Sequence, residues 1–131
     1  MRIFKTKALA RFARQHGIGD DSLVAAVKRA MQGLIDADLG GQLIKQRVAR
    51  PGKGKRGGFR MLIGFGSDRA VFLYGFAKNE RENISNSELL SLREIAATFL
   101  NAPNDRIARA VKDGTLIEVY DDSKDEEDAD Q

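Results

Sequence analysis

Three consecutive segments that read as β-strands constrain the fold of this chain more than any other feature. They cover residues 42–49, 58–65 and 69–78, and they combine β-branched and aromatic residues with period-two alternation. Residues 66–68 form a tight turn between the second and third segments, while residues 50–57 (RPGKGKRG) have the glycine and charge content of a loop. The three segments are therefore expected to pair as a meander.

Helical periodicity precedes these strands. One expected helix has a face made of Leu9, Phe12, Ala13 and His16, with Gly17 as its stop. A second helix, capped by Asp20 or Asp21, has a face made of Leu23, Val27, Ala30, Met31 and Leu34. A short strand over residues 2–5 is expected before both helices.

A further helical region follows the strands. Ser85 and Glu88 form an S-x-x-E capping box, which opens a helix. The face of this helix is made of Leu89, Leu92, Ala96 and Phe99. Residues 103–112 predict a short helix, and residues 116–120 a final extended segment. The order β-α-α-β-β-β-α predicts an α+β sheet with its helices packed on one side.

The composition excludes several classes of protein. At 131 residues with 42% hydrophobic residues, one domain with a modest core is expected. No apolar run approaches the roughly 20 residues that cross a bilayer, and the N-terminus lacks a signal-peptide core. With no cysteine and one histidine, thiolate zinc sites, a cysteine nucleophile and multi-histidine metal sites are excluded. A cytoplasmic protein without membrane contact or cofactor is expected.

Charge is distributed unevenly along the chain. Residues 1–120 hold 21 Lys and Arg against 12 Asp and Glu, whereas residues 121–131 hold seven acids and one lysine. We therefore expect a basic folded domain over residues 1–120 and a disordered acidic tail over residues 121–131. The tail either improves solubility or folds back over the basic surface, and the basic domain favours a polyanionic partner.

The cations concentrate where acids are missing. Residues 39–67 contain no acid, and their seven cations are Lys45, Arg47, Arg50, Lys53, Lys55, Arg56 and Arg60. Unpaired cations repel one another, which favours an anion-binding surface over the alternative of a solvated loop.

Strand parity suggests how these cations are arranged. Alternation puts Lys45 and Arg47 on one face of the first strand, and Arg60 opposite the apolar face of the second. In the third strand Lys78 is expected to share a face with Phe72, Tyr74 and Phe76. A meander would then bring Lys45, Arg47, Arg60 and Lys78 to one side of the sheet. Tyr74 would either pack in the core or line the site, where an aromatic ring can stack on an unpaired base.

Such a patch has the base and the charge stabilisers that cleavage of RNA without a metal needs. Arginines match a phosphate with their planar fork, and a lysine crowded by cations can serve as a base for the 2′-hydroxyl. A general acid is not obvious. His16, at the end of its helix, favours a surface or last-turn role over catalysis. The chain has two glycine-rich stretches, PGKGKRGG and DLGG. Neither has the spacing of a P-loop, which excludes that nucleotide-binding motif.

Several strings resemble a known family. They are GLIDADLGGQLIKQRVARPGKGKRGGFRMLIGF, DRAVFLYGFAKNERENIS and IARAVKDGTLIEV. Together they make residues 1 to about 120 similar to a bacterial branch of the RelE/HigB-like toxins. The resemblance implies a RelE-like twisted antiparallel sheet, with two N-terminal helices packed on it and a C-terminal helical segment. It also implies a ribosome-dependent mRNA endonuclease, inhibited by a cognate antitoxin that commonly carries a helix-turn-helix domain.

The resemblance also implies roles for individual residues. Arg60 matches the family's charge-stabilising arginine, and Lys78 its lysine at the end of the next strand. Lys45 and Arg47 match basic residues of the preceding strand. The chain departs from the family at Asn79, where relatives often have an arginine, with Arg81 two positions on. The position of the general acid, often tyrosine or histidine, is held by Ser85.

The expected catalytic residues are Lys45, Arg47, Arg60, Lys78 and Arg81. The expected RNA- or ribosome-binding residues are Arg50, Lys53, Lys55, Arg56 and Tyr74. Two alternatives to the endonuclease remain: a ParE-like toxin directed at DNA gyrase, and a decayed toxin that only binds its antitoxin.

Overall fold

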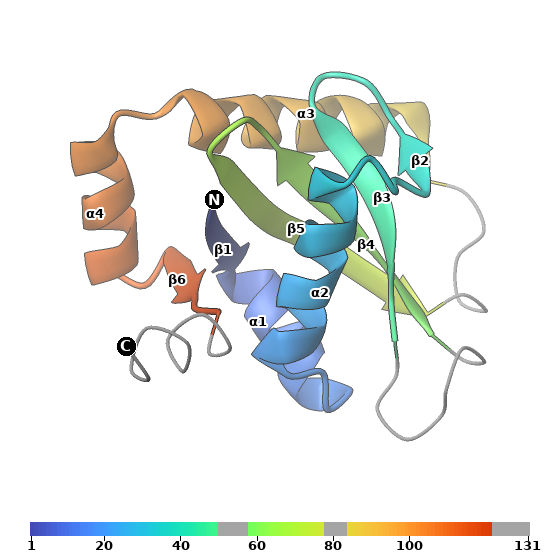
Figure 1. Cartoon of the computed structure of the whole chain (residues 1–131). Coiled ribbons are helices and arrows are strands. Elements are labelled where there is room, and N and C mark those ends of the chain that lie inside the picture. The colour runs from blue at the N-terminus through green and yellow to red at the C-terminus, as the bar shows by residue number, and fades with distance from the viewer. Residues whose placement is uncertain (50–57, 78–83, 122–131) are drawn as a thin grey trace.

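A six-stranded sheet forms the centre of the molecule (Figure 1). The computed structural model describes residues 1–49, 58–77 and 84–121. The strand order is β2-β3-β4-β5-β1-β6. The strands are β1 (Arg2–Thr6), β2 (Ala37–Asp38), β3 (Leu43–Val48), β4 (Phe59–Phe65), β5 (Arg69–Ala77) and β6 (Leu116–Val119). The expected acidic tail lies outside the described residues, apart from its first residue.

The expected meander and the α+β class are confirmed. Strands β3, β4 and β5 pair antiparallel in sequence order. The sheet as a whole is mixed, because β1 lies between β5 and β6, parallel to the first and antiparallel to the second. The two-residue strand β2 extends the sheet beyond β3 and was not predicted.

Helices cover both faces of the sheet, so the expectation that all of them pack on one side is wrong. One core contains residues of α1 (Lys7–Gln15) and α2 (Asp20–Met31) together with one face of β3, β4 and β5. The other core contains residues of α3 (Asn86–Asn101) and α4 (Asn104–Lys112) and the opposite face. Figure 1 shows α1 and α2 on the near side and α3 behind the sheet. Both faces need cover because β4 buries Met61 on one side and Leu62 on the other.

Helix α2 ends earlier than its predicted apolar face. Leu23, Val27 and Ala30 are buried as expected. Met31 and Leu34 are 57% and 60% exposed, which corrects their assignment to that face. For Leu34 the reason is that the helix stops at Met31, so Leu34 lies beyond the helical period.

The predicted capping box positions α3. The Ser85 hydroxyl accepts from the backbone N–H of Glu88 at 3.2 Å, and the Glu88 carboxylate accepts from the Ser85 N–H at 3.4 Å. The helix then crosses β4 at Gly64, where an added Cβ would stand 3.0 Å from the Cβ of Ala96. A glycine is needed here because α3 lies directly on the strand.

A buried arginine fixes the junction between α3 and α4. Arg69, 6% exposed, donates from Nη1 to the carbonyls of Phe99 (2.9 Å) and Ala102 (2.5 Å). Its Nη2 donates to Asn104 Oδ1 at 2.7 Å. These bonds satisfy the end of α3, so this cation serves the fold. Among the described residues, no helix is long and apolar enough to span a membrane.

Candidate functional site

The register of the meander brings three of the expected site residues together. Arg47 pairs with Arg60 across β3 and β4, and Arg60 pairs in turn with Phe76 of β5. Lys45, two residues from Arg47 on the same face, pairs with Leu62. Directly opposite residues share a face of a sheet, with Cβ atoms about 5 Å apart. The expected convergence is therefore confirmed for Lys45, Arg47 and Arg60, which we call the basic strip.

The basic strip lies on the face that α3 covers only in part. Gly64 and Leu62 of β4 lie on this face, under or beside α3. Arg60 is four residues before Gly64, which is about 13 Å along a strand. Arg47 is exposed, whereas Lys45 and Arg60 are half-buried. The strip thus occupies the end of the face farthest from the crossing of α3.

An irregularity in β5 determines which aromatic rings reach this face. Leu62 pairs with Tyr74 but the next residue, Ile63, pairs with Phe72, so Leu73 is an extra residue. Such a bulge reverses the alternation of side chains. Phe72 belongs to the core under α1 and α2, which corrects its assignment to the face of Tyr74 and Phe76. Position 73 is a leucine and not a glycine or proline, so the residue type does not mark the bulge in the sequence.

Tyr74 and Phe76 form the aromatic border of the basic strip. Their ring centroids are 6.0 Å apart. Tyr74 is half-buried and packs against the core under α3, and its cross-strand partner Leu62 is also the partner of Lys45. Tyr74 therefore packs against the core with a ring that is still partly exposed, and its role in lining the site stays a prediction.

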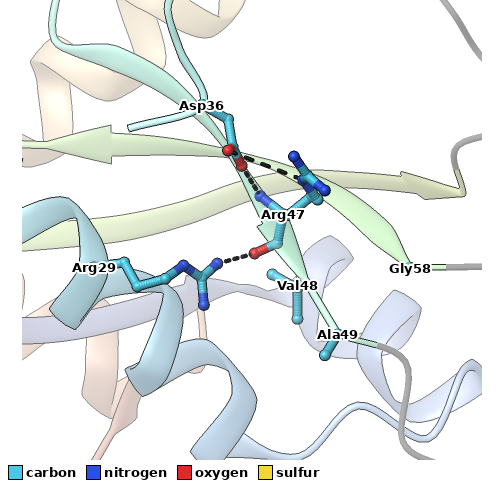
Figure 2. Close-up of a pocket in the computed structure, with 6 residues that line it drawn as sticks. All are labelled: Arg29, Asp36, Arg47, Val48, Ala49 and Gly58. Carbon is cyan, nitrogen blue, oxygen red and sulfur yellow. Dashed lines mark hydrogen bonds and ion pairs between the residues drawn. The ribbon is translucent and has the colours of Figure 1, made fainter. Parts of the chain in front are cut away.

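Side chains from outside β3 hold the backbone of Arg47 (Figure 2). The Arg47 N–H donates to Asp36 Oδ2 at 2.5 Å, and its carbonyl accepts from the guanidinium of Arg29 in α2. The Arg47 side chain is 59% exposed, and its Nε lies 4.0 Å from Asp36 Oδ1. A solvated pair at that distance contributes little to stability. The Arg47 side chain is therefore tethered only weakly.

The same residues border a hollow at the edge of the sheet. Its volume is about 400 Å³, and it is lined by Arg29, Asp36, Arg47, Val48, Ala49 and Gly58. Figure 2 shows Arg29 and Asp36 reaching Arg47 from separate segments. Two guanidinium groups beside an open hollow suit an anionic group. Arg29 and Asp36 were missed in the sequence, because they lie outside the acid-free stretch.

A buried glutamine positions this part of the site. Gln46 is fully buried, and its Nε2 donates to the carbonyls of Ala26 (3.0 Å) and Leu34 (3.1 Å). Its Oε1 accepts from the Asp36 N–H at 2.9 Å. All three bonds link β3 to α2 and to the segment that carries Asp36. Gln46 is thus a positioning residue for Asp36 and, through it, for Arg47.

The remaining expected site residues lie outside the described residues. They are Lys78 and Arg81, together with Arg50, Lys53, Lys55 and Arg56 of the basic loop. The described residues do show where these segments attach. Phe59 pairs with Val48 on one side and Ala77 on the other, so both segments join the sheet beside Arg60 (Figure 1).

Other candidates are given structural roles. His16 caps α1, and its ring lies 4.5 Å from that of Phe12 and 4.8 Å from that of Phe59, as expected for a last-turn histidine. The Ser85 hydroxyl donates to Glu88 Oε1 at 2.9 Å within the cap of α3. This capping role does not favour Ser85 as an acid. In the parts of the chain that the structure describes, no group of three His, Asp or Glu could hold a metal ion.

The fold and the strip define a class: a small α+β protein with a cationic sheet face at the uncovered end of a meander. Comparison with family models identifies it further, since residues 1–119 match the family described as the RelE toxin of the RelE/RelB toxin–antitoxin system. The chain belongs to this family and is a toxin of a toxin–antitoxin system, whose partner is an antitoxin. A comparison with curated proteins finds no match.

Proposed function

We propose that this toxin is a cytoplasmic endoribonuclease that cleaves mRNA on the ribosome. In this proposal, cleavage arrests translation until a cognate antitoxin, of the kind with a helix-turn-helix domain, covers the toxin. Membership of the RelE family supports the part of the proposal that makes the protein a toxin with an antitoxin partner. The arrangement of the basic strip supports the chemistry.

The pairing of Arg47 with Arg60 carries this proposal. Two like charges opposite each other on neighbouring strands destabilise a sheet. The cost becomes understandable when an anion binds to both guanidinium groups. The scissile phosphate of RNA is such an anion, and its negative charge grows as the 2′-oxygen attacks.

The reaction needs one bond made and one broken at this phosphate. The 2′-oxygen forms a bond to phosphorus, the bond to the 5′-oxygen breaks, and a 2′,3′-cyclic phosphate remains. Arg47 and Arg60 stabilise the charge on the phosphoryl oxygens. Lys45, next along the same face, is the candidate base for the 2′-hydroxyl proton.

Two further roles complete the proposed site. Tyr74 stacks on a base next to the scissile bond, because its ring borders the strip. The proton for the 5′-oxygen comes from Lys78 or Arg81. Ser85 is not assigned as the acid, because its hydroxyl is engaged in the cap of α3.

Induced expression of wild-type protein and Arg60→Ala, with mapping of mRNA 5′-ends, tests this function. New ends within translated codons are expected for the wild type and not for Arg60→Ala. Arg106→Ala is a matched control, because Arg106 is an exposed arginine of α4, and it is expected to cleave like the wild type.

Other outcomes would contradict the proposal. Growth arrest with intact mRNA and DNA damage signalling would indicate a gyrase-directed toxin. Harmless expression with tight antitoxin binding would indicate a decayed toxin. Full cleavage by Arg60→Ala would leave the endonuclease intact but remove the basic strip as its site.

A further inference from the structure

Helix α1 presents a row of cations on its exposed side. Lys7, Arg11 and Arg14 lie at i, i+4 and i+7, and all three are exposed. This spacing puts them on one face of a helix, over a length of about 10 Å. The helix contains no acidic residue. We call these three residues the α1 stripe.

The charge in the first turn of α1 opposes the helix dipole, unlike that of the other helices, although Arg14 in the last turn is placed favourably. The positive end of a helix dipole favours acids in the first turn. The other three helices follow this rule, with Asp20 and Asp21 in α2, Glu88 in α3 and Asp105 in α4. Helix α1 instead begins with Lys7 and has no acid in its first turn. Lys7 and Arg11 also repel each other at i, i+4.

The α1 stripe has few partners within the protein. On α2, Lys28 pairs with Asp121 at 3.0 Å, and Arg29 donates to the Arg47 carbonyl. Within the described residues, by contrast, no ion pair joins Arg11 or Arg14 to an acid. The charge of Lys7 acts on Asp113, but that carboxylate already accepts two hydrogen bonds from Thr115.

The underside of α1 holds the stripe in a fixed position. Leu9, Ala10 and Ala13 are buried against the sheet. Phe12 packs so closely on Gly75 of β5 that an added Cβ would stand 2.6 Å from its ring. The three cations are therefore presented by a helix that has little freedom to shift, which lowers the entropy lost on binding.

The chemistry of the stripe fits a polyanion. The other exposed residues of α1 are Ala8 and Gln15, which offer no large apolar side chain. A protein interface relies on buried aromatic or aliphatic anchors, and a membrane surface needs apolar residues to insert. A straight row of cations without such anchors matches successive phosphates of a nucleic-acid backbone.

The stripe approaches the basic strip from the other side of the sheet. His16, just after α1, contacts Phe59, whose neighbour in β4 is Arg60. The C-terminal end of α1 therefore reaches the end of the sheet where the strip lies, while α1 itself covers the opposite face (Figure 1). One RNA segment cannot cover both surfaces without passing around the sheet.

We propose that the α1 stripe is a second RNA-binding surface, which docks the toxin on the phosphate backbone of structured ribosomal RNA independently of sequence. The choice of ribosomal RNA rests on the proposed function. The stripe does not touch the scissile phosphate. It raises the affinity for the ribosome, and the basic strip performs the cleavage.

The test compares two full-length triple variants with equal loss of charge. Lys7→Gln/Arg11→Gln/Arg14→Gln removes the stripe, and Arg106→Gln/Arg109→Gln/Lys112→Gln removes three cations of α4. Binding to purified 70S ribosomes and to a plain RNA duplex is measured from low to high salt. Each lost phosphate contact makes the negative slope of log affinity against log salt less steep by about 0.7 to 0.9. The stripe variant is expected to lose about two units of slope, and the α4 variant to keep the wild-type slope. Circular dichroism checks that both variants fold.

Four outcomes overturn the proposal. An unchanged slope in the stripe variant removes the surface, and an equal loss in both variants reduces the effect to net charge. Weakened binding to the antitoxin alone would assign the stripe to a protein partner. A wild-type protein that binds neither probe also overturns it. A toxin that binds ribosomes through the stripe but cleaves no mRNA refutes the proposed function and leaves this surface standing.

Discussion

The two ends of β4 differ on the same face of the sheet, because one end is covered by a helix and the other carries a partly exposed charge. At Gly64 the strand has no side chain, and Ala96 of α3 packs directly on its backbone. At Arg60, four residues earlier, the strand carries a half-buried cation opposite another cation, Arg47. The first end is closed by small apolar contacts, whereas the second is left open with like charges side by side.

The difference separates stability from chemistry along one strand. The closed end fixes the position of α3 and thereby leaves the other end accessible. The open end tolerates repulsion because the rest of the sheet is held by cores on both faces. Sites of function commonly break local rules that the surrounding structure obeys. Substitutions at the two ends should therefore have different consequences.

The largest effect is expected at the open end. Arg47→Ala and Arg60→Ala should each lower the cleavage rate on the order of 100-fold, because each removes a donor to the charged phosphate. If both bind one phosphate, the double variant should lose less than the product of the single losses. Single-turnover cleavage rates of the wild type, the two single variants and the double variant on programmed ribosomes give this comparison. Strictly multiplicative losses would mean that the two arginines act on different groups.

At the closed end the expected effect is on stability. Gly64→Val should lower the free energy of unfolding by about 3 kcal/mol, because its side chain would overlap with Ala96. Cleavage per folded molecule should stay near the wild-type value. Urea unfolding and active-site titration separate the two quantities. A stable but inactive Gly64→Val would show that the two ends are not independent.

Gln46 connects the core to the open end, and its loss should affect both properties moderately. Gln46→Leu breaks three hydrogen bonds and leaves buried polar groups without partners, which should cost about 2 kcal/mol. RNA affinity should also fall, since Asp36 no longer positions Arg47. Gln32→Leu, at an exposed position beyond α2, is the matched control and should change stability by less than about 0.5 kcal/mol. Unchanged RNA affinity in Gln46→Leu would remove its positioning role.

The smallest effect is expected for Asp36→Asn. Asparagine can still accept from the Arg47 N–H, but it no longer neutralises the Arg47 side chain. Stability should change by less than about 1 kcal/mol, because the pair is solvated. RNA affinity should rise about two- to threefold at low salt, and the gain should disappear at high salt. Titration of labelled RNA at two salt concentrations tests this, and weaker binding at low salt would contradict it.

Much of the fold could be predicted from the sequence because its patterns are local. The alternation of the three central strands gave the meander, and the capping box gave the start of α3. The placement of α3 on the second face depends on apolar residues such as Leu62, which alternation alone assigns to the same face as Arg60. A pattern of period two does not show which part of a face is covered.

The site could be predicted only as far as alternation holds. Lys45, Arg47 and Arg60 follow a regular register, but the extra residue Leu73 moves Phe72 to the other face. Arginines with different roles also look alike in the sequence. Arg69 is buried and fixes the α3–α4 junction. Arg60, nine residues earlier in the sequence, lies at the open end of the sheet. Only the partners in space distinguish them.

The position of β1 has a consequence for how the molecule assembles. This strand begins at the second residue of the chain, yet its partners are residues 69–72 in β5 and residues 116–119 in β6. Contacts between residues so far apart in sequence require long loops to close, which slows folding. During synthesis, β1 has no partner strand until β5 has emerged, and the sheet is complete only after β6. The toxin therefore acquires its full sheet only after residues 116–119 have been translated, which leaves a period in which the new chain is not yet a folded toxin.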